Sequence, residues 1–365
     1  MGGVRDGAGK VSGNMETSEQ ARPERALLEL ARDGDQGAFG ELVGPYQAEL
    51  HAHGYRMLGS VHDAEDALQD ALLRAWRGLP GFEGRSSVRS WLHTILSNAA
   101  LDLTRRRARR EVPAGFSPGG HLAEPPWLEP YPDSAPGDPR LASPEARYEL
   151  RESLELAFVI ALQHLPPAQR AVLILRDVVG LSAAEMASQL GTTVPAITSA
   201  LQRARASVAG RLPGHTQRAA LRSLGDAQTR ALAGRYADAI ERGDADLLVS
   251  MLTRDATWTM PPECECIRGT AAIREFIRND VGSERWQHGA TRANGQLAVG
   301  CYTWAAGRGR YEALVLDVLT LDGEQIAGVH AFIVAEHIQQ PGYDGRFRAE
   351  DFTRFGLPTV LPGPG

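Results

Sequence analysis

Hydrophobic positions recur at intervals of three and four before residue 110 and again after residue 143, a spacing that predicts amphipathic helices. The clearest early series is Val61, Ala64, Leu68 and Leu72. No convincing strand pattern accompanies it. After residue 143, Ser143 followed by Pro144 is a good helix start, because serine caps a helix and proline fits its first turn. Three more helices are expected as far as about residue 211.

From Asp255 onward the apolar spacing changes to two, which is the period of a β-strand. Ala256, Trp258 and Met260 alternate with threonines. Further strands are predicted at 297–304, 311–319 and 326–334, since β-rich runs there are separated by Gly or Asp-Gly. Helices are expected at 228–241 and 270–279. The last third is therefore predicted to be α+β.

Nine of the 22 prolines fall within residues 111–145. Repeated proline without periodicity blocks both helices and strand pairing, so this stretch is predicted to be an extended linker. Trp127, Leu128 and Tyr131 are larger and more apolar than a spacer needs. We expect the stretch around them to dock against another part of the chain.

The chain has 365 residues, which corresponds to two or three domains. Its net charge of -6 excludes a uniformly basic nucleic-acid coat, so any contact with nucleic acid must be local. By segment the charge is +1 for 21–110, -5 for 111–145, +4 for 146–225 and -5 for 226–365. The acidic segments are thus expected to compete with phosphate for the arginine-rich surfaces.

Cellular location and thiol chemistry are constrained by two absences in the sequence. No apolar run approaches a membrane span, and residues 1–20 lack the apolar stretch of a signal peptide, so a cytoplasmic protein is expected. Cys264, Cys266 and Cys301 are too few for a disulfide framework or a four-ligand zinc site. Free thiols, no metal and no cofactor are therefore expected.

The first segment with functional chemistry is acidic. Asp63, Asp66 and Asp70 fall at spacings of three and four, so they share one helical face. Such a face suits a metal site, a solvated surface or a docking surface for a basic partner. No histidine is spaced to join them on that face, which disfavours a metal, and the other two alternatives stay open.

The second segment is basic. Arg105, Arg106 and the arginines after them follow an aromatic and hydroxyl-rich stretch between Phe82 and Trp91. Phosphate-binding charge therefore lies near side chains that stack on bases. A charge run at a helix end is often simply solvated, so this pattern alone leaves both interpretations open.

The third segment has the pattern of a helix-turn-helix. Ser182 and Glu185 form a predicted capping box, the first helix ends at Gly191, and a second begins near Thr193 with Pro195 in its first turn. In this motif the second helix enters the major groove of DNA with its exposed polar side chains. A plain helical hairpin is the alternative.

In this order, the three segments resemble a bacterial sigma-70 factor of the extracytoplasmic-function group, over about residues 24–211 with a gap at the linker. The motifs that carry the resemblance are DAEDALQD at 63–70, the run from Trp91 to Asn98 with Asp102 and Arg105, LPPAQR at 165–170 and SALQRAR at 199–205. It implies that the acidic helix docks on the clamp helices of the largest subunit of RNA polymerase. It also implies that residues 85–106 melt and read the minus-ten element, and that the second helix of the motif reads the minus-thirty-five element.

This resemblance assigns three sets of site residues. The polymerase-binding set is Asp63, Asp66, Gln69 and Asp70. The minus-ten set is Arg89, Trp91, Asn98, Arg105 and Arg106. The minus-thirty-five set is Thr193, Thr198, Ser199, Gln202, Arg203 and Arg205. Pro195 and Thr198 depart from residues common in the family, so base preference is not carried over.

The last third resembles a SnoaL-like domain of the nuclear-transport-factor-2-like superfamily, a curved sheet wrapped with helices into a cone. The matching segments are YADAIERGD at 236–244, DATWTMPP at 255–262 and IRGTAAI at 267–273. Sigma factors with this extension form the SigJ and SigG type, and the Met260-Pro261-Pro262 segment is closer to the SigG type. In that group the fused domain is thought to replace a separate anti-sigma protein.

Relatives of the cone fold include cyclases and isomerases that use a carboxylate or histidine base in an apolar pocket. The candidate pocket residues here are Trp258, Met260, Trp304, Asp317 and His330. A lone Asp or His on an apolar face is more often structural. A regulatory domain that contacts protein, a ligand sensor and a catalyst are thus all open, in that order of preference.

The expected fold is two all-α domains followed by an α+β cone. The expected domains are a leader (1–20), region 2 (21–110), an acidic proline-rich linker (111–145), region 4 (146–212), a second linker (213–227), the SnoaL-like domain (228–345) and a tail (346–365). The expected function is a sigma factor, not an enzyme, that binds core RNA polymerase and promoter DNA. No membrane and no separate anti-sigma factor are required, and a small-molecule ligand of the cone is an open option. The alternative is a SnoaL-type enzyme or ligand sensor fused to a sigma-like DNA-binding module.

Overall fold

The computed structural model describes residues 23–108, 128–133, 154–211, 215–261, 263–282, 284–338 and 345–363, and the expectations for the leader, most of the linker and Trp127 lie outside them. The chain divides into two compact units, Met1–Gly44 and Pro45–Gly365. The first contains α1 (Glu24–Arg32) and α2 (Gln36–Val43). Asp35 caps α2, because its carboxylate accepts a hydrogen bond of 3.0 Å from the amide of Ala38.

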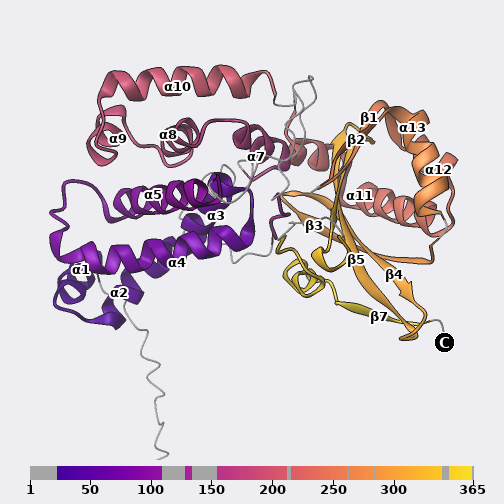
Figure 1. Ribbon diagram of the computed structural model, residues 1–365, viewed down its shortest axis with the longest axis horizontal. Coiled ribbons are helices and arrows are strands. Elements are labelled where there is room, and N and C mark those ends of the chain that lie inside the picture. Colours follow the sequence, from indigo (N-terminus) through magenta and orange to yellow (C-terminus); the bar gives the residue numbers. More distant parts are fainter. Residues whose placement is uncertain are drawn as a thin grey trace, which may run out of the picture. The chain divides into compact units, whose positions relative to one another are not determined.

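The second unit begins with three packed helices, α3 (Gln47–Leu58), α4 (Val61–Gly78) and α5 (Val88–Ala108) (Figure 1). Gly59 ends α3 with a φ of 75°, a left-handed conformation that favours glycine. The next residue, Ser60, caps α4 by accepting from the amide of Asp63. Val61 and Ala64 of the predicted apolar series are buried.

Four further helices follow: α7 (Leu156–Gln163), α8 (Pro167–Asp177), α9 (Ala183–Gln189) and α10 (Val194–Ala209). The predicted capping box is confirmed, since Ser182 and Glu185 bond to each other's amides. Gly191, with a φ of 63°, makes the turn, and Pro195 lies in the first turn of α10. The predicted helix-turn-helix is therefore present. The helix start at Ser143 lies outside the described residues.

The last third is built on a seven-stranded sheet with α11 (Gln217–Glu241) along one face (Figure 1). Its strands are β1 (Leu252–Met260), β2 (Glu263–Arg268), β3 (Trp286–Ala293), β4 (Gln296–Ala305), β5 (Arg310–Asp322), β6 (Gln325–Ile333) and β7 (Val360–Pro362). The order is β2-β1-β6-β5-β4-β3, with β7 paired to β5, and only β1 and β6 run parallel among these pairs. Two short helices, α12 (Ala245–Ser250) and α13 (Gly269–Phe276), complete this layer.

The two faces of the sheet bury different partners. Side chains alternate along each strand, so Leu319 faces α11 while Val318 faces the other way. The face opposite α11 packs against Leu128 and Tyr131 of the linker, each 4% exposed. The expected docking of this linker stretch is thus confirmed for both residues.

The α+β expectation for the last third is confirmed, as are its four predicted strands. The sequence pattern missed β2, β3 and β7, the last of which lies in the expected tail. Within the described residues, no helix is both long and apolar enough to cross a membrane.

Candidate functional site

The acidic stripe of α4 is partly exposed and partly buried. Asp63 is only 1% exposed, because it lies at the packed N-terminal end of the helix. Asp66 and Gln69 are exposed. Asp70 is half-buried and accepts a hydrogen bond of 2.7 Å from Arg74, which also bonds Asp102 of α5 at 2.9 Å. Only part of the expected polymerase-binding set therefore faces solvent.

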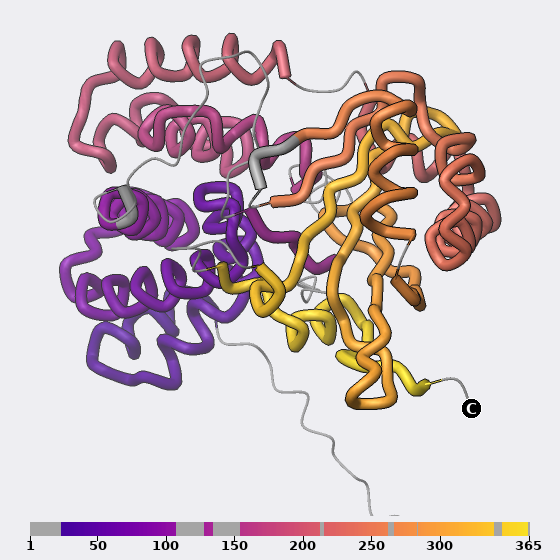
Figure 2. Tube along the Cα trace, turned by 45° about the vertical axis from the view of Figure 1, so that its right-hand side comes forward, coloured from indigo at the N-terminus to yellow at the C-terminus, as the bar shows by residue number. Residues whose placement is uncertain are grey.

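Residues 345–357, which we call the C-terminal segment, lie against the N-terminal end of α4 (Figure 2, yellow tube beside the purple helix). Arg346 donates a hydrogen bond of 2.6 Å to Asp66 and stands 3.9 Å from the carboxylate of Asp63. Arg354 donates one of 2.6 Å to Glu65. Two arginines of the C-terminal segment thus neutralise the exposed carboxylates at this end of α4.

His62 links three segments at the same place. Its Nδ1 is 3.0 Å from Oε2 of Glu129 in the linker, and its Nε2 is 3.4 Å from Oδ1 of Asp351 in the C-terminal segment. Hydrogen bonds to Asp351 and Glu129 raise the pKa of His62 to about 10. The imidazole is therefore charged at neutral pH and holds both carboxylates to the start of α4.

Glu129 also serves as an external cap of α4. Its Oε2 accepts a hydrogen bond of 2.8 Å from the amide of Val61. Its own backbone amide donates a hydrogen bond of 2.9 Å to the carbonyl of Gly59. A carboxylate at a helix N-terminus is favoured because unpaired amides and the helix dipole both attract it. Tyr55 of α3 donates to the carbonyl of Glu129 at 2.7 Å.

Asn294 connects the cone to this junction. It occupies the β3–β4 turn with a φ of 55° and is fully buried. Its side chain accepts a hydrogen bond of 2.8 Å from the amide of Tyr131. It also donates hydrogen bonds of 2.9 Å to the Tyr55 hydroxyl and to the carbonyl of Leu154. Asparagine tolerates the left-handed region because its short side chain bonds locally. A single turn thus ties together the linker, α3 and the chain before α7.

The start of α5 is covered by the helix-turn-helix region. Arg89 donates one hydrogen bond of 2.9 Å to Glu49 of α3 and another of 2.9 Å to the carbonyl of Val179, which follows α8. Although burial alone would raise it, hydrogen bonds from His93 and Arg89 lower the pKa of Glu49 to about 2. Thr94 bonds Gln189 of α9. Arg89, assigned to the minus-ten set, is therefore engaged by protein.

The rest of the expected minus-ten set is more open. Trp91 is half-buried and its ring packs 4.8 Å from that of Phe82. Asn98 is exposed. Arg105 and Arg106 are exposed too, and Arg105 stands 3.3 Å from Asp102. The structure does not gather Arg89 and Arg105 into one site, because they lie more than four turns apart on α5.

The polar face of α10 is turned to solvent. Exposed residues of the expected set are Thr193, Thr198, Gln202, Arg203 and Arg205, while Ser199 is half-buried. Arg203 donates 2.6 Å to Ser199, and Arg205 bonds Asp177 at the end of α8. Ile197 and Leu201 are buried on the opposite side, so the helix presents its polar face as a DNA-reading helix requires.

A cluster of polar side chains is buried between α11 and the sheet. The Tyr236 hydroxyl donates 2.8 Å to Oδ2 of Asp317, and the Cys301 thiol donates 3.2 Å to the same oxygen. Burial raises the pKa of Asp317 to about 6, against the effect of these two bonds. The Tyr236 ring stacks 6.4 Å from that of Trp258.

Three buried polar atoms in this layer have no hydrogen-bond partner among the described residues: Oδ1 of Asp317, Nε1 of Trp258 and Nε2 of His288. His288 pairs with Cys301 across β3 and β4, and its Nδ1 is 3.0 Å from Glu241 of α11. Buried polar groups normally find a partner, and these three are among ten such atoms in the part of the chain that the structure describes.

Only part of the expected pocket set meets here. Trp258, Met260 and Asp317 share the face of α11. Trp304 and His330 belong to the opposite face, where His330 stands 3.0 Å from Thr259. One-residue alternation explains the split, since His330 neighbours Val329 and Ala331 of the α11 side. Tyr236, Cys301 and His288 were missed, because sequence spacing does not show which helix covers a sheet.

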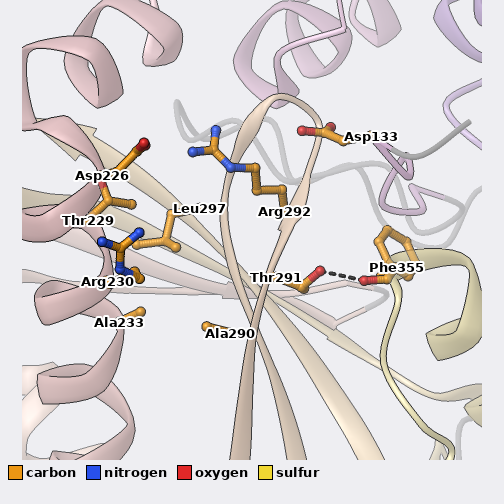
Figure 3. A pocket seen from close by; sticks show the side chains of 10 residues that line it. All are labelled: Asp133, Asp226, Thr229, Arg230, Ala233, Ala290, Thr291, Arg292, Leu297 and Phe355. Carbon is orange, nitrogen blue, oxygen red and sulfur yellow. Dashed lines mark hydrogen bonds between the residues drawn. The ribbon is translucent and has the colours of Figure 1, made fainter. Parts of the chain in front are cut away.

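An open cavity of about 430 Å³ lies near the end of the C-terminal segment (Figure 3). Arg230 of α11 and Arg292 of β3 line it together with Asp133 and Asp226, so the charges of its lining balance. Thr291 in its wall donates 2.5 Å to the carbonyl of Phe355. The cavity thus borders the attachment of the C-terminal segment to the cone. Across the described residues, no group of three or more His, Cys, Asp or Glu side chains is placed to hold a metal ion.

Comparison with protein families gives three matches along the chain. Residues 42–110 match Sigma-70 region 2, residues 156–208 match Sigma-70 region 4, and residues 233–329 match a SnoaL-like domain. The ECF RNA polymerase sigma factor SigG of Mycobacterium tuberculosis is 41% identical over 342 residues, which cover 90% of this chain and 86% of that protein. SigJ of the same organism is 31% identical over 265 residues, covering 68% and 76%.

A solved structure has a similar fold. The crystal structure of the Mycobacterium tuberculosis extracytoplasmic function sigma factor SigJ aligns with a TM-score of 0.51 at 24% identity, covering 81% of this chain and 96% of that one. The order of a helical part and a cone is thus shared with that protein.

Proposed function

Because this chain belongs to the extracytoplasmic-function group of the sigma-70 family and carries regions 2 and 4 with a SnoaL-like domain, we propose that it recruits core RNA polymerase through the acidic face of α4. Its α5 then captures the minus-ten element and α10 reads the minus-thirty-five element. The polar face of α10, exposed while its apolar side is packed, is the observation that carries this proposal.

The proposed activity is binding and strand separation without covalent chemistry. Bases freed from the duplex are held by stacking and by nearby positive charge. Trp91 and Arg105 supply these two features on α5, half-buried and exposed respectively. Asp66, Gln69 and Asp70 remain our candidates for polymerase contact. Asp63 is buried, so we assign it to the packing of α4 instead.

Run-off transcription with the full chain and core polymerase tests this function. We expect a promoter-dependent transcript that is lost when Arg203 is replaced by alanine together with Gln202→Ala. Replacing Val360, an exposed cone residue at 38%, serves as the control and should leave the transcript unchanged. Absence of any promoter-dependent transcript on a genome-wide fragment library would refute the proposal.

We also infer that the fused cone modulates this activity. The junction of His62, Glu129, Asn294 and the C-terminal segment supports the inference, because it joins the cone to α3 and α4. Transcript yield should therefore change when the junction is loosened by Asn294→Gly, and unaltered yield would count against any coupling.

A second role for the cone is favoured by the three unpartnered buried atoms. We propose that the layer between α11 and the sheet binds a small, largely apolar molecule that carries a hydroxyl or carbonyl group. Asp317 Oδ1 would accept from such a hydroxyl, and Trp258 Nε1 would donate to a carbonyl. This is a binding role, and none of these residues is assigned a catalytic step.

Mass measurement of the purified chain under non-denaturing conditions tests the ligand. An organic adduct is expected on the natural chain and should be lost from Trp258→Phe, which keeps the ring but removes the donor. Trp304→Phe, on the opposite face, is the matched control and should retain the adduct. A natural chain that carries no adduct after expression in a related bacterium would contradict this role.

A further inference from the structure

The cavity at the edge of the cone takes no part in the roles proposed above (Figure 3). Its volume of about 430 Å³ lies within the range of roughly 300–1,000 Å³ that small-molecule sites have. We propose that it binds a small zwitterion with an apolar body, of the class of apolar amino acids and short peptides. The carboxylate of this ligand pairs with Arg230 and Arg292, and its ammonium group pairs with Asp226.

A break in α11 shapes the first wall of the cavity. Gly225 interrupts this helix with a φ of 77° and a ψ of 163°, which lie outside the helical region. Asp226 follows in the first turn of the restarted helix, where the helix dipole favours a carboxylate. At spacings of three, four and seven from it, the same helical face carries Thr229, Arg230 and Ala233. This face lines the cavity.

The edge of the sheet forms the second wall, because β3 is the last strand in the sheet order. Arg292 of β3 stands opposite Leu297 of β4, so the two side chains share one face. Leu297 packs in the layer beneath α11, and Arg292 therefore faces that helix. Asp133 of the linker completes the lining, and its carboxylate accepts a hydrogen bond of 2.7 Å from the amide of Gly295. The site thus joins the linker to the cone.

The floor of the cavity is apolar and its rim is charged. Ala233 and Leu297 in the floor are 3% and 4% exposed. Asp226, Arg230 and Arg292 are exposed, and Figure 3 shows them reaching from α11 and from β3 toward the same opening. Within the described residues, these three side chains make no hydrogen bond or ion pair. Their charges are therefore available to a ligand that covers the floor.

The signs of the rim charges select the ligand. Guanidinium groups on two walls suit a carboxylate, which accepts hydrogen bonds from arginine in a planar fork. A net anion would also face Asp226 and Asp133, and a net cation would face both arginines, so like-charge repulsion disfavours each of them. A molecule that carries both charges avoids this repulsion, and its apolar part covers the floor.

Ligand-observed NMR and calorimetry of the full chain with millimolar leucyl-leucine test the site. Three analogues each remove one feature: N-acetyl-leucyl-leucine lacks the ammonium group, leucyl-leucine amide lacks the carboxylate, and glycyl-glycine lacks the apolar side chains. Leucyl-leucine should bind one molecule per chain, and each analogue should bind more weakly by roughly fivefold. Absence of leucyl-leucine binding, or equal binding of any analogue, would overturn the proposal.

Substitutions at the rim assign the binding to this cavity. Arg230→Gln and Arg292→Gln should each weaken leucyl-leucine binding by roughly two- to fivefold, the worth of a partly exposed ion pair. Asp226→Asn should weaken it too, yet improve binding of N-acetyl-leucyl-leucine, because one repelling carboxylate is gone. The matched controls Arg235→Gln and Asp238→Asn, exposed on α11 away from the cavity, should bind as the natural chain does. Equal losses in controls and rim variants would refute the site.

Trp258→Phe distinguishes this cavity from the layer between α11 and the sheet. Trp258 does not line the cavity, so the variant should bind leucyl-leucine as the natural chain does. Loss of binding in Trp258→Phe, with normal binding in Arg230→Gln and Arg292→Gln, would place the dipeptide in the inner layer and overturn the proposal. None of these outcomes bears on run-off transcription, so the proposed sigma-factor function stands or falls separately.

Discussion

Helices α4 and α10 are the two that we expect to meet large partners, and they differ in what already covers them. The acidic end of α4 is paired with arginines of the C-terminal segment and capped by the linker. The polar face of α10 is open. The difference supports our proposal that the fused cone modulates activity, and we infer that it acts on the binding of polymerase rather than on the reading of the minus-thirty-five element.

A substitution at Asn294 should have the largest effect on the difference between α4 and α10. Asn294→Ala removes three buried side-chain hydrogen bonds and puts alanine, which tolerates the left-handed region less well than asparagine, in a left-handed turn, at a cost of about 3 kcal/mol. Hydrogen exchange should show faster opening of the first turns of α4 and no change in α10. Asn294→Gly loses the same three hydrogen bonds but has no backbone strain in this turn. Partial recovery of stability in Asn294→Gly relative to Asn294→Ala would therefore separate the two causes.

Two exposed apolar residues allow a matched test, since Leu73 lies on α4 and Val194 on α10, 56% and 44% exposed. Leu73→Asp should weaken polymerase binding by roughly tenfold or more, because a charge enters the centre of the predicted interface. It should leave binding to a minus-thirty-five duplex unchanged. Val194→Asp should do the reverse, because it brings negative charge near phosphate. Equal effects of both changes on both partners would remove the contrast.

A smaller effect is expected from Arg203→Ala on α10. Loss of one phosphate or base contact costs about 1–2 kcal/mol, and a phosphate contact also lowers the slope of affinity against salt by about one. Titration of a promoter duplex at several salt concentrations measures both. Since α10 is already open, the loss should be the same in the natural chain and in the Arg346→Glu, Arg354→Glu variant; a difference between them would mean that the C-terminal segment also restrains α10.

The smallest effect concerns pH. The pKa of His62 is raised from its ordinary 6.5 to about 10, so the stabilisation it gives is complete below about pH 6.5 and is lost as pH rises through 10. His62→Gln should lower the stability of the α4 junction by about 1 kcal/mol at pH 6, and the deficit should shrink toward pH 10. Hydrogen exchange of α4 at pH 6 and 8, corrected for intrinsic rates, gives the lower part of this curve, and urea unfolding at pH 9 and 10 gives the upper part. A deficit that is independent of pH would mean that His62 acts by packing alone.

Sequence periodicity was sufficient for the helix-turn-helix, the capping box and four strands, because these depend on local spacing. It was wrong for residues 217–227, expected to be linker, which belong to α11, and it did not predict α12. It was also sufficient to expect that Leu128 and Tyr131 dock. It could not separate the faces of the cone: His330 and Asp317 both sit among apolar residues, and only the register of β5 with β6 assigns them to opposite sides.

The junction at α4 was beyond sequence reasoning for a different cause. Arg346 and Asp66 are 280 residues apart, and a surface arginine in a predicted tail carries no signal of its partner. The expectation that acidic segments would compete for arginine-rich surfaces does not describe α4, where the C-terminal segment supplies the arginines and region 2 the acids. Net charge by segment gives no information on such local pairs.

A covalent tether tests most directly whether the closed junction and bound polymerase exclude each other. Glu65→Cys and Arg354→Cys, in a chain with Cys264→Ser and Cys266→Ser, can be joined by a short bis-maleimide; Cys301 is buried, and burial raises the pKa of its thiol, so it should react poorly. The same variant capped with N-ethylmaleimide is the control. We predict that the tethered chain binds core polymerase at least roughly tenfold more weakly than the capped one, while both bind a minus-thirty-five duplex equally. Equal binding of polymerase by tethered and capped chains would contradict the account.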